Sequence, residues 1–139
     1  MTPSHLPDLG PLLGLDLGTK TVGVAVSDRA QQLAVAVETI RVTRPTAGLP
    51  RLEILARERA AVGLVVGLPL HLDGRAGTRA QGARRVAGIL GDALALPVTL
   101  WDERLSTRAV ELALIRADVS RARRRRAVWM LQGFLDSLH

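Results

Sequence analysis

The chain has 139 residues, 47% of them hydrophobic, a formal charge of +6 and no cysteine. This size fits one domain with a full core, and the lack of cysteine excludes disulfides, thiolate metal sites and cysteine nucleophiles. No apolar run reaches the roughly 20 residues that a membrane span needs. We therefore expect a soluble, cytoplasmic protein without a membrane partner, built as a single domain over residues 1–139 in which residues 1–11 are flexible.

The spacing of the apolar residues changes along the chain and predicts where strands and helices lie. Alternation of apolar residues indicates strands, a short wholly apolar run indicates a strand buried in a parallel sheet, and helical spacing indicates amphipathic helices. The order predicts an α/β fold with a mixed five-stranded sheet, three antiparallel strands then two parallel, and helices on both faces. The expected strands are residues 12–17, 21–28, 31–40, 63–67 and 96–101, and the expected helices are residues 48–60, 78–91, 106–116 and the final stretch to Leu138.

A carboxylate interrupts the first apolar run. Asp16 lies within the expected strand and is followed by Gly18-Thr19-Lys20, after which the chain returns through a second apolar run. A buried carboxylate is costly unless a cation or hydrogen-bond donors satisfy it. A metal ion is the simplest occupant, with polar turn groups and the Lys20 ammonium close by. The alternative is an aspartate that only caps the turn.

Two acids, Asp102 and Glu103, follow the last expected strand. Sites in open α/β sheets collect beyond the carboxyl ends of the parallel strands, so these acids and Asp16 can converge. Carboxylates without cysteine or histidine favour Mg²⁺ or Mn²⁺, which can activate water and stabilise the leaving oxygen in phosphodiester cleavage. The alternative is that Asp102-Glu103-Arg104 only begins a solvated helix with Ser106 as its N-cap.

Arginine supplies almost all of the positive charge, because Lys20 is the only lysine among 19 basic residues. Six arginines lie from Arg116 to Arg126, against one acid, ahead of the final helix. Beside a metal-binding edge, such a block would bind a nucleic-acid backbone without reading its sequence, whereas the alternative is a solvated face. The residues expected to bind nucleic acid are Lys20, Arg104, Arg121, Arg123, Arg124, Arg125 and Arg126.

Four segments carry a resemblance to a known family. They are Leu15-Asp16-Leu17-Gly18-Thr19-Lys20 with Gly23-Val24-Ala25-Val26-Ser27-Asp28, then Gly67-Leu68-Pro69 with Asp73-Gly74, then Asp102-Glu103-Arg104-Leu105-Ser106-Thr107, and finally Leu131-Gln132-Gly133-Phe134-Leu135-Asp136. In this order they resemble the YqgF family, also called RuvX, over about Leu12 to Leu138. The resemblance implies a ribonuclease H-like fold and a nuclease, either a Holliday junction resolvase or an enzyme that matures the 5′ end of pre-16S ribosomal RNA.

The same resemblance implies that Asp16 is the first metal ligand and that Asp102 or Glu103 supplies the second carboxylate. The chain departs from the family at the third acid, because Arg126 runs directly into Ala127-Val128 where a short acid-bearing segment usually precedes the last helix. Counting back from Gln132 places Arg123 at the acid's position. Either the chain uses two acids, or the sequence lacks a short segment that carries the third, and we favour the second.

The expected function is therefore that of a divalent-metal-dependent endonuclease, with Mg²⁺ or Mn²⁺ as cofactor and branched DNA or precursor rRNA as partner. Resolvases cut two symmetric strands, so a homodimer is expected as well. The alternative from another class is a catalytically silent nucleic-acid-binding module that keeps the fold and the arginine surface. The missing third acid favours that alternative.

Overall fold

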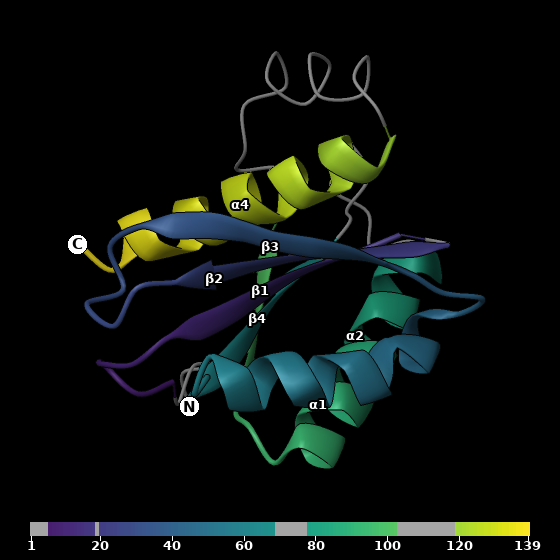
Figure 1. The fold of residues 1–139 in the computed structure, drawn as a ribbon, viewed down its shortest axis with the longest axis horizontal. Coiled ribbons are helices and arrows are strands. Elements are labelled where there is room, and N and C mark those ends of the chain that lie inside the picture. The colour runs from purple at the N-terminus through teal and green to yellow at the C-terminus, as the bar shows by residue number, and fades with distance from the viewer. Residues whose placement is uncertain (1–5, 19, 69–77, 103–118) are drawn as a thin grey trace.

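The computed structural model describes residues 6–18, 20–68, 78–102 and 119–139 (Figure 1). The helix expected at residues 106–116 lies outside the described residues, and the other expected elements are present. The strands are β1 (Leu12–Leu17), β2 (Thr21–Ser27), β3 (Ala34–Arg41), β4 (Gly63–Leu68) and β5 (Val98–Asp102), and the helices are η1 (Pro45–Gly48, a 3₁₀ turn), α1 (Leu49–Glu58), α2 (Thr78–Leu94) and α4 (Val119–Ser137).

The five strands form one mixed sheet in the order β3-β2-β1-β4-β5. Strand β2 is antiparallel to both β1 and β3, whereas β1, β4 and β5 run parallel to one another. This confirms the expected α/β sheet of three antiparallel and two parallel strands. It also places β1 at the centre, with its carboxyl end beside those of β4 and β5.

Helices cover both faces of the sheet, as expected. Helices α1 and α2 lie on one face, and α4 lies across the other (Figure 1). The alternation of β1 divides its side chains between two cores: Leu13 and Leu15 pack with α1 and α2, whereas Leu12 packs with α4. Position 16 is therefore on the α4 face. None of the helices within the described residues is both long and apolar enough to cross a membrane.

Two glycines let α4 approach the sheet closely. A Cβ atom at Gly14 on β1 would lie 2.8 Å from the Cβ atom of Leu131, and one at Gly133 on α4 would lie 3.3 Å from the indole nitrogen of Trp101. A Cβ atom at Gly14 would force the helix or the strand to shift, because interiors are densely packed, whereas one at Gly133 would require the indole of Trp101 to yield by a few tenths of an ångström. The position of α4 over β1 therefore depends on small residues on both elements.

The start of β3 differs from the expected one. The sequence pattern predicts a strand over residues 31–40, but β3 begins at Ala34 and ends at Arg41. Gln31 adopts a left-handed backbone with φ of 58°, and Asp28 Oδ1 accepts hydrogen bonds from the amides of Gln32 and Leu33. The side chain of Asp28 therefore closes a wider turn than the apolar pattern indicates.

Candidate functional site

Asp16 lies deep in the molecule near the carboxyl end of the central strand. Asp16 is 1% exposed, and its backbone pairs with Gly23 on β2. The glycine on the neighbouring strand has no side chain to cover the carboxylate. Strand β1 lies between β2 and β4, with pairing to β2 at Asp16 and pairing to β4 up to Leu15. The carboxylate is therefore held rigidly on the α4 face.

The guanidinium of Arg126 on α4 approaches this carboxylate. Its Nε lies 3.8 Å from Oδ2 of Asp16, and the two side chains are 24% and 2% exposed. This separation is that of an ion pair and is longer than a direct hydrogen bond. Arg126 is among the arginines that we expect to bind nucleic acid. In the structure it lies beside Asp16, the acid that we expect to be the first metal ligand.

Asp102 lies at the same edge of the sheet as Asp16, but on the other face. It ends β5 and pairs with Leu68 on β4. Along β5, Leu100 packs with the core beneath α1 and α2, whereas Trp101 packs with the core beneath α4. Alternation therefore assigns Asp102 to the face opposite Asp16. Glu103, the other candidate acid, lies outside the described residues.

The remaining basic candidates divide into three groups. Lys20 follows the end of β1, and its side chain is exposed; Arg124 is half-buried and Arg125 is exposed on α4. Arg121 and Arg123 belong to α4, but only their backbone is described, and Arg104 lies outside the described residues. The first part of α4 thus carries a run of arginines, and the last of them, Arg126, lies beside Asp16.

The described residues supply part of a metal site. The oxygen atoms of Asp16 suit a hard cation such as Mg²⁺ or Mn²⁺, because these ions prefer carboxylate and water ligands. Within the described ranges, however, no three histidine, cysteine or acidic side chains gather as a potential metal site. Asp16 therefore fits as one ligand, and the other carboxylates of a complete site would have to come from residues such as Glu103.

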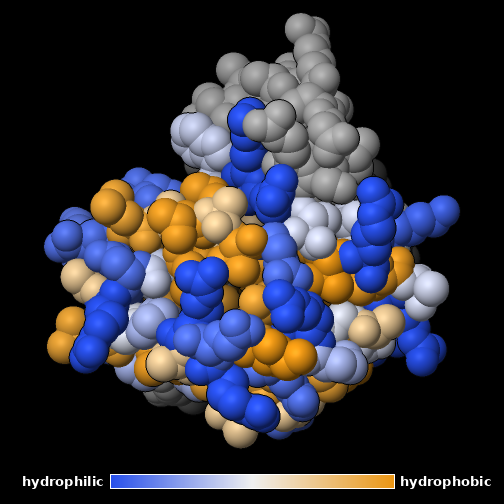
Figure 2. Space-filling view, viewed as in Figure 1, coloured by the Kyte–Doolittle hydropathy of each residue, from blue (hydrophilic) through white to orange (hydrophobic). Residues whose placement is uncertain are grey.

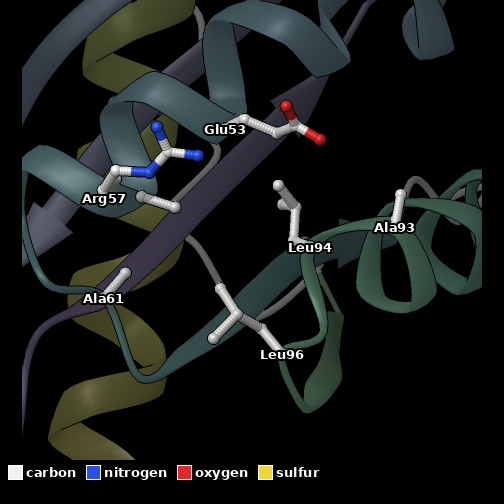
Figure 3. Close-up of a pocket in the computed structure, with 7 residues that line it drawn as sticks. Glu53, Arg57, Ala61, Ala93, Leu94 and Leu96 are labelled. Atoms are coloured by element: carbon white, nitrogen blue, oxygen red, sulfur yellow. The ribbon is translucent and has the colours of Figure 1, made fainter.

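A separate hollow lies between α1 and the end of α2, with a volume of about 280 Å³. Glu53 and Arg57 extend from α1 along one side of it, and Leu94 and Leu96 line the other (Figure 3). Leu96 precedes β5, so the hollow lies at the amino-terminal edge of the parallel strands, opposite the edge that carries Asp16. It is therefore distinct from the candidate site.

A family model described as "RuvX: Holliday junction resolvase" matches residues 10–137. The chain belongs to the RuvX family. A relative from Rhodopseudomonas palustris strain BisB5, named "Putative pre-16S rRNA nuclease", is 53% identical and covers 97% of this chain and 88% of its own length. A relative of the same name from Nitrobacter winogradskyi is 51% identical over 97% of this chain and 86% of its own length.

The solved structures show that this RuvX chain has a ribonuclease H-like fold. The RuvC protein of Thermus thermophilus, in a complex with a Holliday junction substrate, superimposes with a TM-score of 0.61 over 92% of this chain and 95% of RuvC, at 12% identity. A second structure of that RuvC gives a TM-score of 0.55. At such identities the likeness concerns the fold alone, which is the fold expected from the sequence.

Two structural features of the RuvX chain are absent from the sequence-based expectations. The first is the pairing of Asp16 with Arg126, and the second is the hydrogen bonding of Gln132 to the start of β3. The cost of burying a carboxylate signals that Asp16 needs a cation. No local pattern tells which of the 19 basic residues supplies it.

Proposed function

We propose that this chain is a divalent-metal-dependent endonuclease that hydrolyses phosphodiester bonds in structured nucleic acid, with branched DNA junctions or precursor 16S rRNA as substrates. Membership of the RuvX family and the names of its relatives support a nuclease. The observation that carries the metal-dependent interpretation is the Asp16 carboxylate, buried at the central strand and lying on the face that α4 covers.

The charge of α4 supports a nucleic-acid partner. The first turn of α4 holds no acidic residue, and arginines follow at 121 and 123–126. Positive side chains near the amino-terminal end of a helix oppose its dipole, which favours anions there. Backbone phosphates would satisfy both the arginines and the helix end. Because this part of α4 reaches Asp16, a strand bound along it would pass the carboxylate.

In this mechanism Asp16 and Glu103 would hold the metal ion, and Asp102 would support the end of β5. When bound, Mg²⁺ or Mn²⁺ would supply Lewis-acid activation of water and stabilisation of the leaving oxygen. The buried strand fixes the Asp16 oxygens, and the exposed Arg125, with Arg124, binds the phosphates that flank the scissile bond. Lys20, in the turn after β1, adds a further backbone contact.

The second candidate is a nucleic-acid-binding module without catalytic activity. A specific observation favours it: within the described residues, the carboxylate on the α4 face has an arginine beside it, and Asp102 is assigned to the opposite face. Such a protein would bind the same substrates through α4 and leave them intact.

Cleavage of a synthetic four-way junction and of precursor 16S rRNA distinguishes the two. We expect cleavage with Mg²⁺ or Mn²⁺, none with EDTA, and none by Asp16→Asn, whose binding to both substrates persists because the arginines remain. The matched control is Asp92→Asn, which changes an exposed aspartate at the end of α2. Cleavage that survives EDTA would exclude the metal mechanism, and intact substrate under every condition would favour the binding module.

The two acids after β5 are expected to differ. Glu103→Gln should abolish cleavage, because its carboxylate is the proposed second metal ligand. Asp102→Asn should lower activity less and act mainly through stability. Rates under single-turnover conditions, compared with melting temperatures of the same variants, test this assignment. Equal and complete losses with unchanged stability would make both acids ligands.

A further inference from the structure

We propose that Arg126 is a built-in counter-ion of Asp16 that competes with the divalent metal for this carboxylate, and so sets the metal affinity of the site. The inference rests on the proposed metal dependence. It concerns a residue of this chain that lies within the site, and it assigns to Arg126 a role different from phosphate binding.

The geometry of the pair is the first argument. Nε of Arg126 lies 3.8 Å from Oδ2 of Asp16, and the carboxylate is almost wholly removed from solvent at 2% exposure. A buried carboxylate without a cation is costly, so the guanidinium stabilises the protein when no metal is bound. A divalent cation that binds the same oxygens meets the repulsion of a positive charge only a few ångströms away, and solvent screens this repulsion weakly.

The two partners are held differently, and Arg126 is the one that a metal ion can displace. Asp16 is fixed on a central strand, and Ala127, the neighbour of Arg126, is fully buried in the core beneath α4. The backbone of Arg126 is therefore held in place. Its side chain is longer and 24% exposed, so the guanidinium has a route to solvent when a metal ion takes its position. The separation of 3.8 Å is also longer than the direct contacts of a bidentate arginine–carboxylate pair.

Binding of Mn²⁺ in the absence of nucleic acid tests the proposal. We expect Arg126→Gln to bind Mn²⁺ on the order of threefold to tenfold more tightly than the unchanged chain, since one nearby positive charge is removed. Arg125→Gln is the matched control: it removes the same charge from the adjacent position of α4, where the side chain is exposed. Its effect should be much smaller. Isothermal titration and the electron paramagnetic resonance signal of free Mn²⁺ give the affinities.

Thermal unfolding supplies a second readout. Without metal, Arg126→Gln should melt at a lower temperature than the unchanged chain, because Asp16 loses its counter-ion. Saturating Mn²⁺ should raise the melting temperature of Arg126→Gln more than that of the unchanged chain, because tighter binding gives greater stabilisation. In an Asp16→Asn background, Arg126→Gln should alter neither Mn²⁺ affinity nor the response to Mn²⁺.

Each outcome decides the proposal. If Mn²⁺ binding depends on Asp16 but is equal or weaker in Arg126→Gln, or if Arg125→Gln has the same effect, the counter-ion role is wrong while the proposed metal site stands. If neither the unchanged chain nor Arg126→Gln binds Mn²⁺ through Asp16, both proposals are overturned. Mn²⁺ binding by Arg126→Gln but not by the unchanged chain would support the proposal, because it would mean that Arg126 excludes the metal from Asp16.

Discussion

Gln132 on α4 forms hydrogen bonds to the backbone just before and at the start of β3, about 100 residues earlier in the chain. Its Oε1 accepts from the amide of Ala34 at 2.9 Å, and its Nε2 donates to the carbonyl of Gln32 at 2.8 Å. The same side-chain amide donates to Asp136 Oδ1 at 3.0 Å. One side chain thus joins the C-terminal helix to the edge strand and the turn before it.

Replacing Gln132 with alanine should lower the free energy of unfolding by about 1–3 kcal/mol, because the amide of Ala34 and the carbonyl of Gln32 lose their partner. The matched control, Gln32→Ala, removes an exposed amide side chain and leaves the bonded carbonyl in place, so it should change stability by about 0.5 kcal/mol or less. Urea unfolding followed by circular dichroism measures both. Equal effects for the two variants would contradict the role given to Gln132.

Adding one carbon at Gly14 should destabilise the protein, because that Cβ would lie 2.8 Å from the Cβ atom of Leu131. The expected loss is about 1–3 kcal/mol, as for other overpacked cores. Gly88→Ala is the control: its Cβ would have no neighbour within 4 Å on α2, so the variant should gain about 0.5–1 kcal/mol. Leu131→Gly, which removes that Cβ atom, should make the cost of Gly14→Ala smaller. A cost independent of Leu131 would argue against this contact.

Acid should weaken the turn before β3. Hydrogen bonds from the amides of Leu33 and Gln32 lower the pKa of Asp28 below its usual value. The folded pKa therefore lies below the unfolded one, so this stabilisation is complete above about pH 4 and is lost as the pH falls through the folded pKa. Asp28→Asn keeps an acceptor oxygen and should lack this part of the acid dependence. Carboxyl chemical shifts against pH measure the pKa, and a midpoint at or above the usual value would refute the prediction.

Arg124 and Arg125 should contribute to nucleic-acid affinity without regard to sequence. Changing both to glutamine should weaken binding to duplex, junction and rRNA about equally, and should make the slope of log affinity against log salt less negative by about 0.9 for each phosphate that is no longer neutralised. Arg84→Gln with Arg85→Gln removes the same charge from exposed positions of α2 and should leave the slope unchanged. Fluorescence anisotropy in EDTA across a salt series gives the slopes. A weakening confined to junctions would mean that these arginines read shape.

Most of the fold is predictable from the sequence because its sheet is covered on both faces. Leu13 and Leu15 face one core and Leu12 the other, so β1 is a nearly unbroken apolar run that the sequence shows directly. The start of β3 is not predictable in this way. It depends on the left-handed backbone of Gln31 and on the side chain of Asp28, which are local hydrogen-bonding features without an apolar period.

The candidate site divides in the same manner. Asp16 stands out in the sequence because a carboxylate inside an apolar strand is rare and costly. Its partner does not stand out, because Arg126 follows three other arginines and differs from them only in its angular position around the axis of α4. The packing of α4 on the sheet fixes which side of the helix faces Asp16, and the contact of Leu131 with Gly14 is part of this packing. Tertiary packing, rather than residue type, selects which arginine meets the carboxylate.

Hydrophilic and apolar residues are interspersed on the face of the molecule seen in Figure 2, whereas β1 is shielded from solvent along its whole length. This strand is hydrogen-bonded to β2 and β4 and covered by helices on both sides. Its amide protons should therefore exchange with deuterium only when the whole domain opens. The position of Asp16 then lasts as long as the folded state itself, so among the described residues it is α4, and not the strand that carries the carboxylate, that is left to adjust.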